Sequence, residues 1–363
     1  MLEKQVEFRT METEDIPRVQ VLKKRSFQTL EGLFQSTVHE GFVMEIQDKL
    51  VAVFDYKFLD QEKKEVYVNT VCVDPHFAGE GHGKYLYKAS IDTLIAQGAE
   101  RFCALVKDDN VASYYLFQDN GFVRSSIPEV INKMGIGFLG KSLAKTPFLF
   151  ANGMDFYVKD INQELEAKHE DARQLLSFII INLFLTVPVV CIRLLQNKNY
   201  WLPILSYTIF LIFLVLPRFL LYAYFKIQKK PERTILQNRF FRLNNGGLLL
   251  TLLTSMLNGP FFLNANAYRE AYPRDRREEK PYFIAELGRF SLLVIMLILG
   301  IILQHNVFIF LSELSALYLF FFALPVYPFE AMGGKRIMDY SKPVGIVLAI
   351  LGVLSLLLRF FIF

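Results

Sequence analysis

Five apolar stretches, each about as long as a membrane-spanning helix, constrain this chain more than any other feature of its sequence. A helix that crosses a bilayer takes about 20 apolar residues. Stretches of that length follow one another in the second half of the chain: Leu175–Leu195, Trp201–Phe225, Phe283–Leu303, Val307–Ala323 and Val344–Phe363. They predict an α-helical polytopic membrane domain over residues 175–363. A shorter stretch, Gly246–Leu263, breaks at Asn258-Gly259-Pro260 and is either a sixth span or a re-entrant hairpin.

The first 160 residues have a different composition. They carry 19 Lys and Arg against 23 Asp and Glu, whereas residues 161–363 carry 21 against 13. An acidic domain, residues 1–160, therefore precedes the basic membrane domain, and a charged helix over residues 161–174 is predicted to connect them. A hydrophobic share of 53% excludes a disordered chain, and three cysteines cannot form an even disulfide framework. Nucleic acid is not an expected partner, because the soluble domain is net acidic.

The distribution of charge also predicts an orientation. The opening residues, MLEKQVEFRT, contain no apolar run of the kind that a signal peptide needs, so the first domain is expected to be cytoplasmic. Basic residues gather in connections that would lie on that same side: Lys226, Lys229, Lys230, Arg233, Arg239 and Arg242, then Lys335, Arg336 and Lys342. Because basic connections favour the cytoplasmic face, the bias favours re-entry of Gly246–Leu263, which also keeps Arg269–Lys280 inside.

Residues 1–160 are predicted to form a mixed α+β sheet with flanking helices. Alternating or β-branched runs predict strands at Val6–Thr10, Phe42–Gln47, Leu50–Leu59, Glu65–Val73, Arg101–Val106 and Met154–Ile161. Helices are predicted at Met11–Phe27, Lys84–Gly98 and Asn110–Gly121. The stretch Val123–Pro147 is predicted to be a loop, whose apolar and basic residues either pack on the domain or lie on the membrane surface.

A glycine-rich loop after the strand Glu65–Val73 carries the chemistry. Gly79, Gly81 and Gly83 remove side chains where backbone N–H groups must approach an anion closely. The helix that follows adds unpaired donors and partial positive charge at its N-terminus, and together they predict a pyrophosphate cradle. The spacing is not that of a Walker loop, because Tyr85 follows Gly83-Lys84 where serine or threonine is needed. A plain tight turn is the alternative.

The loop and a second block resemble the GNAT N-acetyltransferase superfamily. In that family a strand ending V-x-P precedes G-x-G-x-G and a helix, and here Val73-Asp74-Pro75 leads to Gly79-Glu80-Gly81-His82-Gly83. The second block runs from Asn110 to Gly121-Phe122. The resemblance covers about residues 5–158, and it implies acetyl-CoA or another acyl-CoA as the donor of an acyl group to an amine.

The resemblance also implies where the donor binds. Loop amides would hold the pyrophosphate, and the exposed strand backbone would pair with the pantetheine arm. The implied acyl-CoA-binding residues are Val71, Val73, Ala78, Gly79, Gly81, Gly83, Lys84, Asn110 and Phe117. Two positions depart from the family: Ala78 stands where an Arg or Gln is usual, and Phe117 where a Tyr often protonates the leaving thiolate.

Three residues are candidates for catalytic proton transfer. Glu65 and Asn69 lie with Tyr67 at every second position of one strand, so they share a face. Glu65 is the candidate base that takes the proton of the amine through water, against the alternative of a surface glutamate at a strand start. Tyr114 lies on the same helical face as Phe117 and would replace the missing acid, unless it only packs in an aromatic helix.

The membrane domain carries charged residues inside its apolar stretches: Arg218, Glu286, Arg289 and Glu313. Such residues are costly in a bilayer and often functional. Arg218 needs a partner, for which Glu286 or Glu313 is expected, and Glu286 and Arg289 lie close enough to a span end to snorkel. A substrate pathway is the alternative to a structural pair.

The membrane domain also resembles site-2-type intramembrane metalloproteases in two short blocks, Ala323–Phe329 with Gly333-Gly334, and Ala285–Arg289. Those enzymes hold zinc with H-E-x-x-H and an Asp. Neither His169 nor His305 stands in that pattern. The resemblance therefore implies a metal-free scaffold, and no metal is expected.

These patterns together predict an integral membrane acyltransferase that transfers an acetyl group from acetyl-CoA to an amine at the cytoplasmic face. The expected partners are an acyl-CoA, the lipid bilayer and an amine acceptor of unidentified kind. The presence of the membrane domain favours an acceptor that is itself held in the membrane. The first alternative is a non-catalytic acyl-CoA-binding sensor or adaptor coupled to a pseudo-protease-like or transport-related membrane domain. A transporter regulated by the soluble domain is the second.

Overall fold

The computed structural model describes residues 6–27, 40–107, 110–146, 153–163, 173–196, 201–228, 238–243, 245–256, 266–269, 275–324 and 332–362. The chain divides into two compact units. One unit is Met1–Leu149 with Asp155–Lys168, and the other is Phe150–Met154 with His169–Phe363. Most of the predicted connecting helix, 161–174, falls outside the described residues, and its first three residues are not helical.

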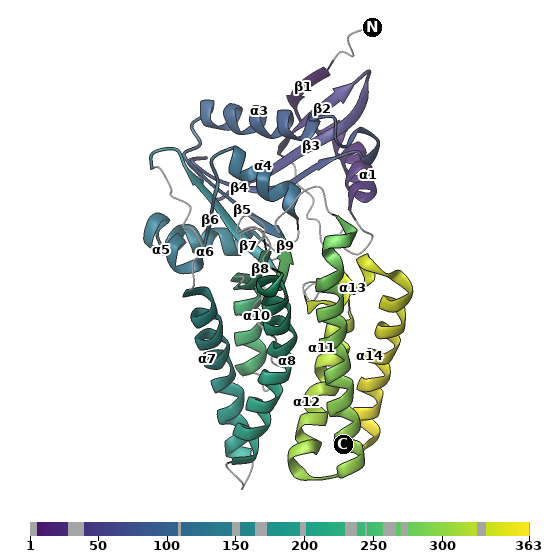
Figure 1. Cartoon of the computed structure of the whole chain (residues 1–363). Coiled ribbons are helices and arrows are strands. Elements are labelled where there is room, and N and C mark those ends of the chain that lie inside the picture. The colour runs from purple at the N-terminus through teal and green to yellow at the C-terminus, as the bar shows by residue number, and fades with distance from the viewer. Residues whose placement is uncertain are drawn as a thin grey trace. The chain divides into compact units, whose positions relative to one another are not determined.

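A mixed sheet of seven described strands forms the middle of the first unit (Figure 1). The strands are β1 (Val6–Thr10), β2 (Gly41–Ile46), β3 (Lys49–Phe58), β4 (Glu65–Val73), β5 (Arg101–Lys107), β6 (Val123–Ser125) and β7 (Met154–Asp160). Their spatial order is β1-β2-β3-β4-β5-β7-β6. The pairs β1–β2, β2–β3, β3–β4 and β6–β7 are antiparallel, and the pair β4–β5 is parallel. The predicted α+β class is confirmed.

Helices cover both faces of this sheet because its strands bury side chains on both sides. The helices are α1 (Ile16–Ser26), α3 (His82–Ala96), α4 (Val111–Asp119), α5 (Ile127–Met134) and α6 (Ile136–Lys145). α3 and α4 pack on one face, where Leu86 and Phe117 join Phe54 of β3 in the core. On the opposite face, α1 packs on the cluster that contains Val53, and α5 and α6 pack on the cluster that contains Tyr67.

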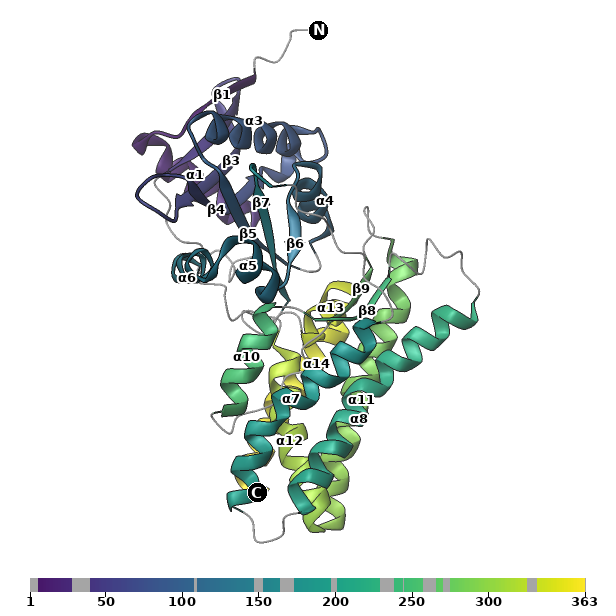
Figure 2. The ribbon, with the colours of Figure 1, turned by 90° about the vertical axis from the view of Figure 1, so that its left-hand side faces the viewer.

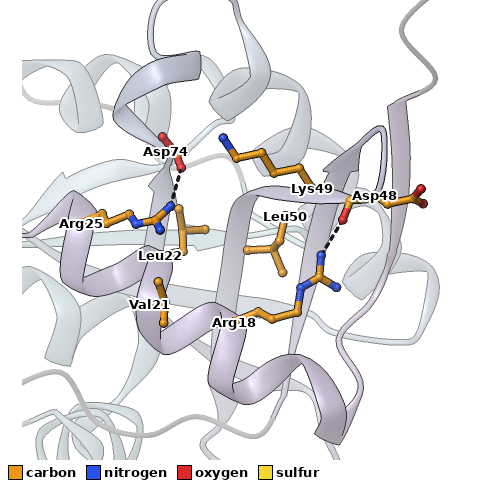
Figure 3. Close-up of a pocket in the computed structure, with 8 residues that line it drawn as sticks. All are labelled: Arg18, Val21, Leu22, Arg25, Asp48, Lys49, Leu50 and Asp74. Carbon is orange, nitrogen blue, oxygen red and sulfur yellow. Dashed lines mark hydrogen bonds and ion pairs between the residues drawn. The ribbon is translucent and has the colours of Figure 1, made fainter.

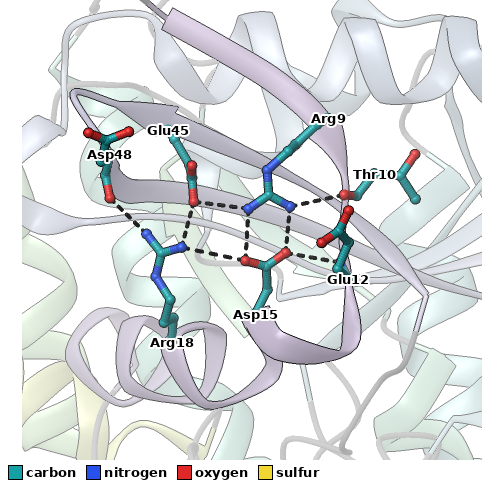
Figure 4. Close-up of polar contacts among 7 residues, drawn as sticks. All are labelled: Arg9, Thr10, Glu12, Asp15, Arg18, Glu45 and Asp48. Atoms are coloured by element: carbon teal, nitrogen blue, oxygen red, sulfur yellow. Dashed lines mark hydrogen bonds and ion pairs between the residues drawn. The ribbon is translucent and has the colours of Figure 1, made fainter.

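A cluster of ion pairs fixes the start of α1 against the first two strands (Figure 4). Arg9 donates to both carboxylate oxygens of Asp15, at 2.6 and 2.8 Å, and to Glu45 at 3.1 Å. Arg18 donates to the same oxygen of Glu45 at 2.7 Å. The guanidinium of Arg9 holds the pKa of Asp15 below its usual range, with a further hydrogen bond from the Glu12 amide. α1 is therefore held in a single register on the sheet.

The prediction of a loop over Val123–Pro147 is wrong for its described residues. They form β6, α5 and α6, and Phe138 is 2% exposed in the core. α5 begins at a capping box, in which Ser126 and Glu129 satisfy each other's backbone amides, and it ends at Gly135, whose φ is 87°. β6 escaped prediction because three residues are too few for a periodic pattern.

The second unit is a helical bundle with one small sheet (Figure 2). Its described elements are α7 (Arg173–Gln196), α8 (Trp201–Ile227), β8 (Asn238–Arg242), α10 (Asn245–Met256), β9 (Asn266–Arg269), α11 (Arg276–Leu303), α12 (Asn306–Ala323), α13 (Gly334–Tyr340) and α14 (Lys342–Ile362). Among the described residues, five helices are long and apolar enough to cross a membrane: α7, α8, α11, α12 and α14. All five predicted apolar stretches are therefore helices.

Small residues let the helices of this unit approach closely. A Cβ at Gly300 would lie 2.2 Å from the Cβ of Ser312, where α11 meets α12. A Cβ at Gly352 would lie 2.7 Å from that of Ala323, where α14 meets α12. The hydroxyl of Ser355 donates to the carbonyl of Ala316 across the same contact, at 3.1 Å. Close backbone contacts and interhelical hydrogen bonds of this kind hold helices together in an apolar solvent.

The part of the short apolar segment Gly246–Leu263 that the structure describes lies in the helix α10. α10 is 12 residues long, about 18 Å, which is too short to cross a bilayer. The strands on either side of the segment pair with each other, Arg242 with Asn266. Ser255 of α10 accepts from the Val189 amide at 3.3 Å and donates to the Leu185 carbonyl at 2.7 Å, and so it bridges one turn of α7.

The charged residues of the bundle differ from their predicted arrangement. Glu286 and Arg289 do not snorkel to a surface, because they are 3% and 1% exposed. Their side chains bond each other at 3.0 Å. Glu313 accepts from Arg359 at 2.9 Å, and the acidic neighbour of Arg218 among the described residues is Glu286, the other partner expected for it. The order of the apolar segments along the sequence could not predict these ion pairs, because it does not show which helices pack together in the folded bundle.

Candidate functional site

The geometry of the site begins with a bulge in β4. In the register with β3, Asp55 pairs with Thr70 and the following residue pairs with Val68, so Asn69 is the extra residue. The described pairing of β4 with β5 runs from Glu65 to Val68 and ends where the bulge begins. A bulge bends its strand and disrupts the ladder. After Val68, β4 is therefore no longer paired with β5 in the described structure, and the backbone edge of β4 that faces β5 is open there.

The backbone of Val71 and Val73 faces that open edge. The amide of Asp74 donates to the Val51 carbonyl of β3 at 2.8 Å. Because backbone groups along an antiparallel strand alternate in direction, those of Val71 and Val73 point to the other side, toward β5. Ser26 of α1 donates its hydroxyl to the carbonyl of Val73 at 3.1 Å. This arrangement suits the predicted pairing with an extended, amide-containing chain.

The glycine loop lies at the end of this edge. Asp74 begins it by accepting from the His76 amide at 3.0 Å, and a short 3₁₀ helix, Pro75–Phe77, follows. Gly79 and Gly81 both have φ of 87°, in the left-handed region that side chains disfavour. A Cβ at either glycine would have no protein atom within 4 Å in the described structure, so both face open space.

The start of α3 supplies the donors of the predicted cradle. Gly81 is the N-cap, and its carbonyl accepts the first helical bond, from the Tyr85 amide at 3.1 Å. The amides of His82, Gly83 and Lys84 precede that bond and so have no partner within the helix. A loop that carries no side chains at Gly79 and Gly81, followed by the amides of the first turn of α3, fits a pyrophosphate. The Lys84 ammonium pairs with Asp119 of α4 at 2.8 Å, so its predicted part in binding rests on its backbone.

Glu65, the candidate base, lies at the opposite end of β4 from the loop. It is 9% exposed and stands where β4 and β5 are still paired. Its two carboxylate oxygens are held by different cations, Lys141 at 2.9 Å and Arg101 at 3.5 Å. The surface position that was the alternative interpretation is therefore wrong.

Asn69 contacts a buried carboxylate, that of Asp55, which was not among the candidates predicted from the sequence. Its side-chain amide donates to Asp55 at 2.8 Å. Asp55 is fully buried on β3 and forms an ion pair with Lys23 of α1. Burial raises the pKa of Asp55 above its usual range, although the ammonium of Lys23 opposes the shift. The available signal was an acidic residue in the middle of the apolar run Leu50–Leu59.

The two aromatic candidates of α4 lie at different depths. Phe117 is 5% exposed and packs edge-on against Tyr87 and Phe122, with ring centroids 4.9 and 5.0 Å away. Tyr114 is half-buried, with its ring edge-on to Tyr157 at 6.0 Å. Asn110 caps α4 by accepting from the Ser113 amide at 3.1 Å. Phe117 is thus a core residue, and Tyr114 is the more accessible ring of the two.

A separate hollow of about 310 Å³ lies beside the start of the glycine loop (Figure 3). Its lining includes Arg18 and Arg25 of α1, Lys49 at the start of β3, and the acidic residues Asp48 and Asp74. Arg25 pairs with Asp74 at 3.7 Å, and Arg18 donates to the Asp48 carbonyl at 2.9 Å. Its charges are mixed, so the hollow shows no preference for an anion or a cation.

The sulfur and carboxylate groups of the described residues do not gather into a metal site. No group of three or more His, Cys, Asp or Glu side chains there could hold a metal ion. Cys72 and Cys103 are buried, and burial raises the pKa of each thiol to about 12. Neither thiol is therefore ionised near neutral pH, as a nucleophile or metal ligand would need to be.

Comparison with known proteins identifies the first unit. Residues 8–122 match the acetyltransferase (GNAT) family, so the chain contains a GNAT N-acetyltransferase domain there. No curated protein matches the chain. The match does not extend into the helical bundle, and the resemblance of that part to site-2-type proteases gains no support from it.

Three of the solved structures with similarity to this chain are an N-acetyltransferase, a synthase and a protein named Ard1. The ribosomal-protein-S18-alanine N-acetyltransferase of Escherichia coli shares 16% identity, over 46% of this chain and 99% of that one, with a TM-score of 0.33. The N-acetylglutamate synthase of Neisseria gonorrhoeae, complexed with coenzyme A and N-acetyl-glutamate, shares 19% identity over 44% and 36%, with a TM-score of 0.31. Ard1 from Thermoplasma volcanium shares 15% over 44% and 99%, also at 0.31.

Proposed function

We propose that this chain is an N-acetyltransferase held in a membrane, in which the GNAT domain transfers an acetyl group from acetyl-CoA to an amine. The observation that carries the proposal is the open cradle formed by Gly79, Gly81 and the first-turn amides of α3, placed at the end of an unpaired edge of β4. Backbone amides at a helix N-terminus bind phosphate groups. Enzymes of this family use acetyl-CoA, whose pyrophosphate and amide-containing arm match these two features in turn.

In this proposal the pyrophosphate binds the amides from Ala78 to Lys84, and the arm pairs with the backbone of Val71 and Val73. The nitrogen of a neutral amine then attacks the thioester carbonyl, a C–N bond forms, and the C–S bond breaks. The amine loses a proton, and the departing sulfur gains one. The hydroxyl of Tyr114 is the proton donor to sulfur, since the phenyl ring of Phe117 has no proton to give.

Two carboxylates compete for the proton of the amine. Asp55 is buried, its pKa is raised, and Asn69 at the bulge connects it to the open edge. Both carboxylate oxygens of Glu65 are already in contact with a cation, Lys141 or Arg101, which leaves them less accessible to a water or an amine. We therefore assign the proton to Asp55, through a water that Asn69 holds, and Glu65 is the second candidate.

Paired substitutions test this assignment. Asp55→Asn is made together with Lys23→Met, because Lys23 would otherwise be left buried without its partner. Turnover is read as release of the CoA thiol in the presence of polyamines, peptide amines and phosphatidylethanolamine. The double variant is expected to lose at least roughly 100-fold in turnover with acetyl-CoA binding unchanged, whereas Glu65→Gln loses less than tenfold. The reverse order of effects would make Glu65 the base.

We also propose that the five long helices span the membrane, with the GNAT domain on the cytoplasmic side. The re-entrant reading of α10 supports this, since it keeps the basic connections of the bundle on one side, as positive residues favour. Single cysteines introduced into a Cys191→Ser background test the topology on intact cells. Gln304→Cys, in the α11–α12 turn, is expected to react with a membrane-impermeant maleimide from outside. Lys342→Cys is expected to react only after permeabilisation, and the opposite result would invert the topology.

A non-catalytic acyl-CoA sensor is the second candidate function, and the burial of Phe117 favours it. That residue occupies the position of the family's frequent acid but lies within the aromatic core. A sensor would bind acetyl-CoA and release no thiol with any amine in the panel. An enzyme would release thiol with at least one amine, and Gly81→Trp would abolish both the release and the binding.

A further inference from the structure

Two arginines are buried in the apolar bundle, on the packed helices α8 and α11. Arg218 of α8 and Arg289 of α11 are each 1% exposed and are the largest fully buried side chains of the described chain. The charged neighbours of Arg218 are Arg289, Glu286 and Arg336. A guanidinium stays protonated in proteins, so burial adds fixed positive charge to this part of the bundle.

The carboxylate of Glu286 offsets only part of this positive charge. Its Oε1 accepts from Arg289 Nη2 at 3.0 Å, within α11. The Arg289 guanidinium also lies over the ring of Phe322, 5.8 Å from its centroid. Arg218, Arg289 and Glu286 therefore sum to one excess positive charge, before Arg336 of α13 is counted. A buried charge without compensation is strongly unfavourable, and the described residues around this cluster leave a positive excess that a counter-charge would relieve.

Several polar atoms of the cluster are unsatisfied. Within the described residues, Nε and Nη1 of Arg218, Nε of Arg289 and Oε2 of Glu286 have no hydrogen-bond partner. Buried donors of this kind are rare in folded proteins and call for a ligand or solvent to complete them. The donors come from two guanidinium groups on different helices, and such planar forks match the oxygens of a phosphate.

The backbone is also fitted to this cluster. Gly333, which precedes α13, has φ of 109°, and a Cβ there would lie 2.3 Å from Oε2 of Glu286. The same Cβ would lie 2.7 Å from the ring of Phe322. Only a glycine lets α13 pack so closely against the carboxylate, which fixes Glu286 beside Arg289.

We propose that Arg218 and Arg289 form a binding site for a phosphate-class oxyanion inside the helical bundle. The anion would accept from the unpaired donors of both arginines, while Glu286 orients Arg289. A phosphodiester carries one negative charge, which offsets the excess of Arg218, Arg289 and Glu286 but not the further charge of Arg336. The oxyanion is either the phosphate of a lipid headgroup or a free phosphate, and the two sources share the same chemistry.

Thermal unfolding of the full-length protein in dodecyl maltoside tests the site. Trp201 is the chain's single tryptophan and stands at the start of α8, so its fluorescence reports on the bundle. One arm adds inorganic phosphate against chloride at equal ionic strength. The other adds phosphatidylglycerol against phosphatidylcholine, whose headgroup is zwitterionic. At a hundredfold excess over Kd, the Tm of the wild type is expected to rise by roughly 5 °C.

The variants separate a specific site from general anion effects. Arg218→Met removes the unpaired donors and is expected to lose the shift without a lower Tm in chloride, because no hydrogen bond is broken. Arg359→Met is the matched control, since it breaks the contact with Glu313 at 2.9 Å and should keep the shift. Arg218→Lys, which retains the charge, is expected to fold and to lose more than half of the shift, and it serves if the methionine variant does not fold.

A shift with phosphate in solution identifies a free oxyanion, and a shift with phosphatidylglycerol alone identifies a lipid headgroup. The proposal is overturned if neither arm raises the Tm of the wild type. It is equally overturned if Arg218→Met and Arg218→Lys respond as the wild type does, or if Arg359→Met loses the shift along with them.

Discussion

Two glycines at opposite ends of α3 allow the cradle to be tested against a matched control. Gly81 precedes the helix and Gly98 follows it, with φ of 87° and 100°. A Cβ at either position would have no protein atom within 4 Å in the described structure. Alanine at each position is strained by about 1–2 kcal/mol, because the left-handed region crowds its Cβ. Gly81→Ala and Gly98→Ala should therefore lower the Tm by similar amounts, roughly 2–8 °C.

The two variants should differ in ligand binding. A methyl group at Gly81 would displace a phosphate oxygen from the first-turn amides of α3, and a charge-assisted hydrogen bond contributes about 1.5–3 kcal/mol. The Kd for acetyl-CoA should rise roughly 10- to 100-fold in Gly81→Ala and stay unchanged in Gly98→Ala. Isothermal titration calorimetry of the full chain in detergent measures it. Equal Kd values for the two variants would refute the cradle.

Three further predictions concern stability and catalysis. Arg9→Met should destabilise the GNAT domain by about 2 kcal/mol in denaturant unfolding, because the buried Asp15 loses its two short hydrogen bonds and keeps only the longer contact with Arg18, at 3.5 Å, and the amide of Glu12. Because the folded pKa of Asp15 is depressed, its contribution is present above its unfolded value of about 3.9 and is lost as pH falls through the folded pKa, so Arg9→Met should flatten acid unfolding. Tyr114→Phe should reduce thiol release more than tenfold without changing the Kd for acetyl-CoA. Gly300→Leu should lower the Tm of the bundle in detergent, whereas Gly288→Leu, whose Cβ meets no atom within 4 Å in the described structure, should not.

The features that repeat along the sequence were predictable. The five apolar stretches became helices, and the strand Glu65–Val73 has the bounds that its β-branched run indicates. The glycine loop was predictable because its residues act through their own backbone. Two left-handed glycines followed by a helix need no distant partner to form a loop of this shape.

The stretch after Phe122 was not predictable from periodicity. β6 has three residues, and α5 and α6 have eight and ten, so neither strand nor helix repeats long enough to stand out. The local signal was chemical. Ser126 and Glu129 stand at capping-box spacing, and Gly135 ends the helix, which together mark α5 without any hydrophobic repeat.

Contacts between distant segments account for the remaining differences. Asp55 and Asn69 meet only because the bulge sets the register of β3 against β4. Arg218 lies near Arg289 only because α8 packs on α11. Spacing along the sequence predicts which residues are neighbours within one helix or strand. It does not predict which charged residues of two different elements are buried next to each other. The buried groups on which both proposals rest were therefore visible only in the folded chain.

Hydrogen exchange of the full-length protein, measured by mass spectrometry with and without acetyl-CoA, tests the central claim most directly. If acetyl-CoA binds the loop and the open edge of β4, protection should appear in peptides that cover residues 69–73 and 78–85. Peptides from β1 and β2, whose backbone pairing is already complete along their shared edge, should be unchanged. Protection confined to other segments, or none at saturating acetyl-CoA, would contradict the assignment of the site.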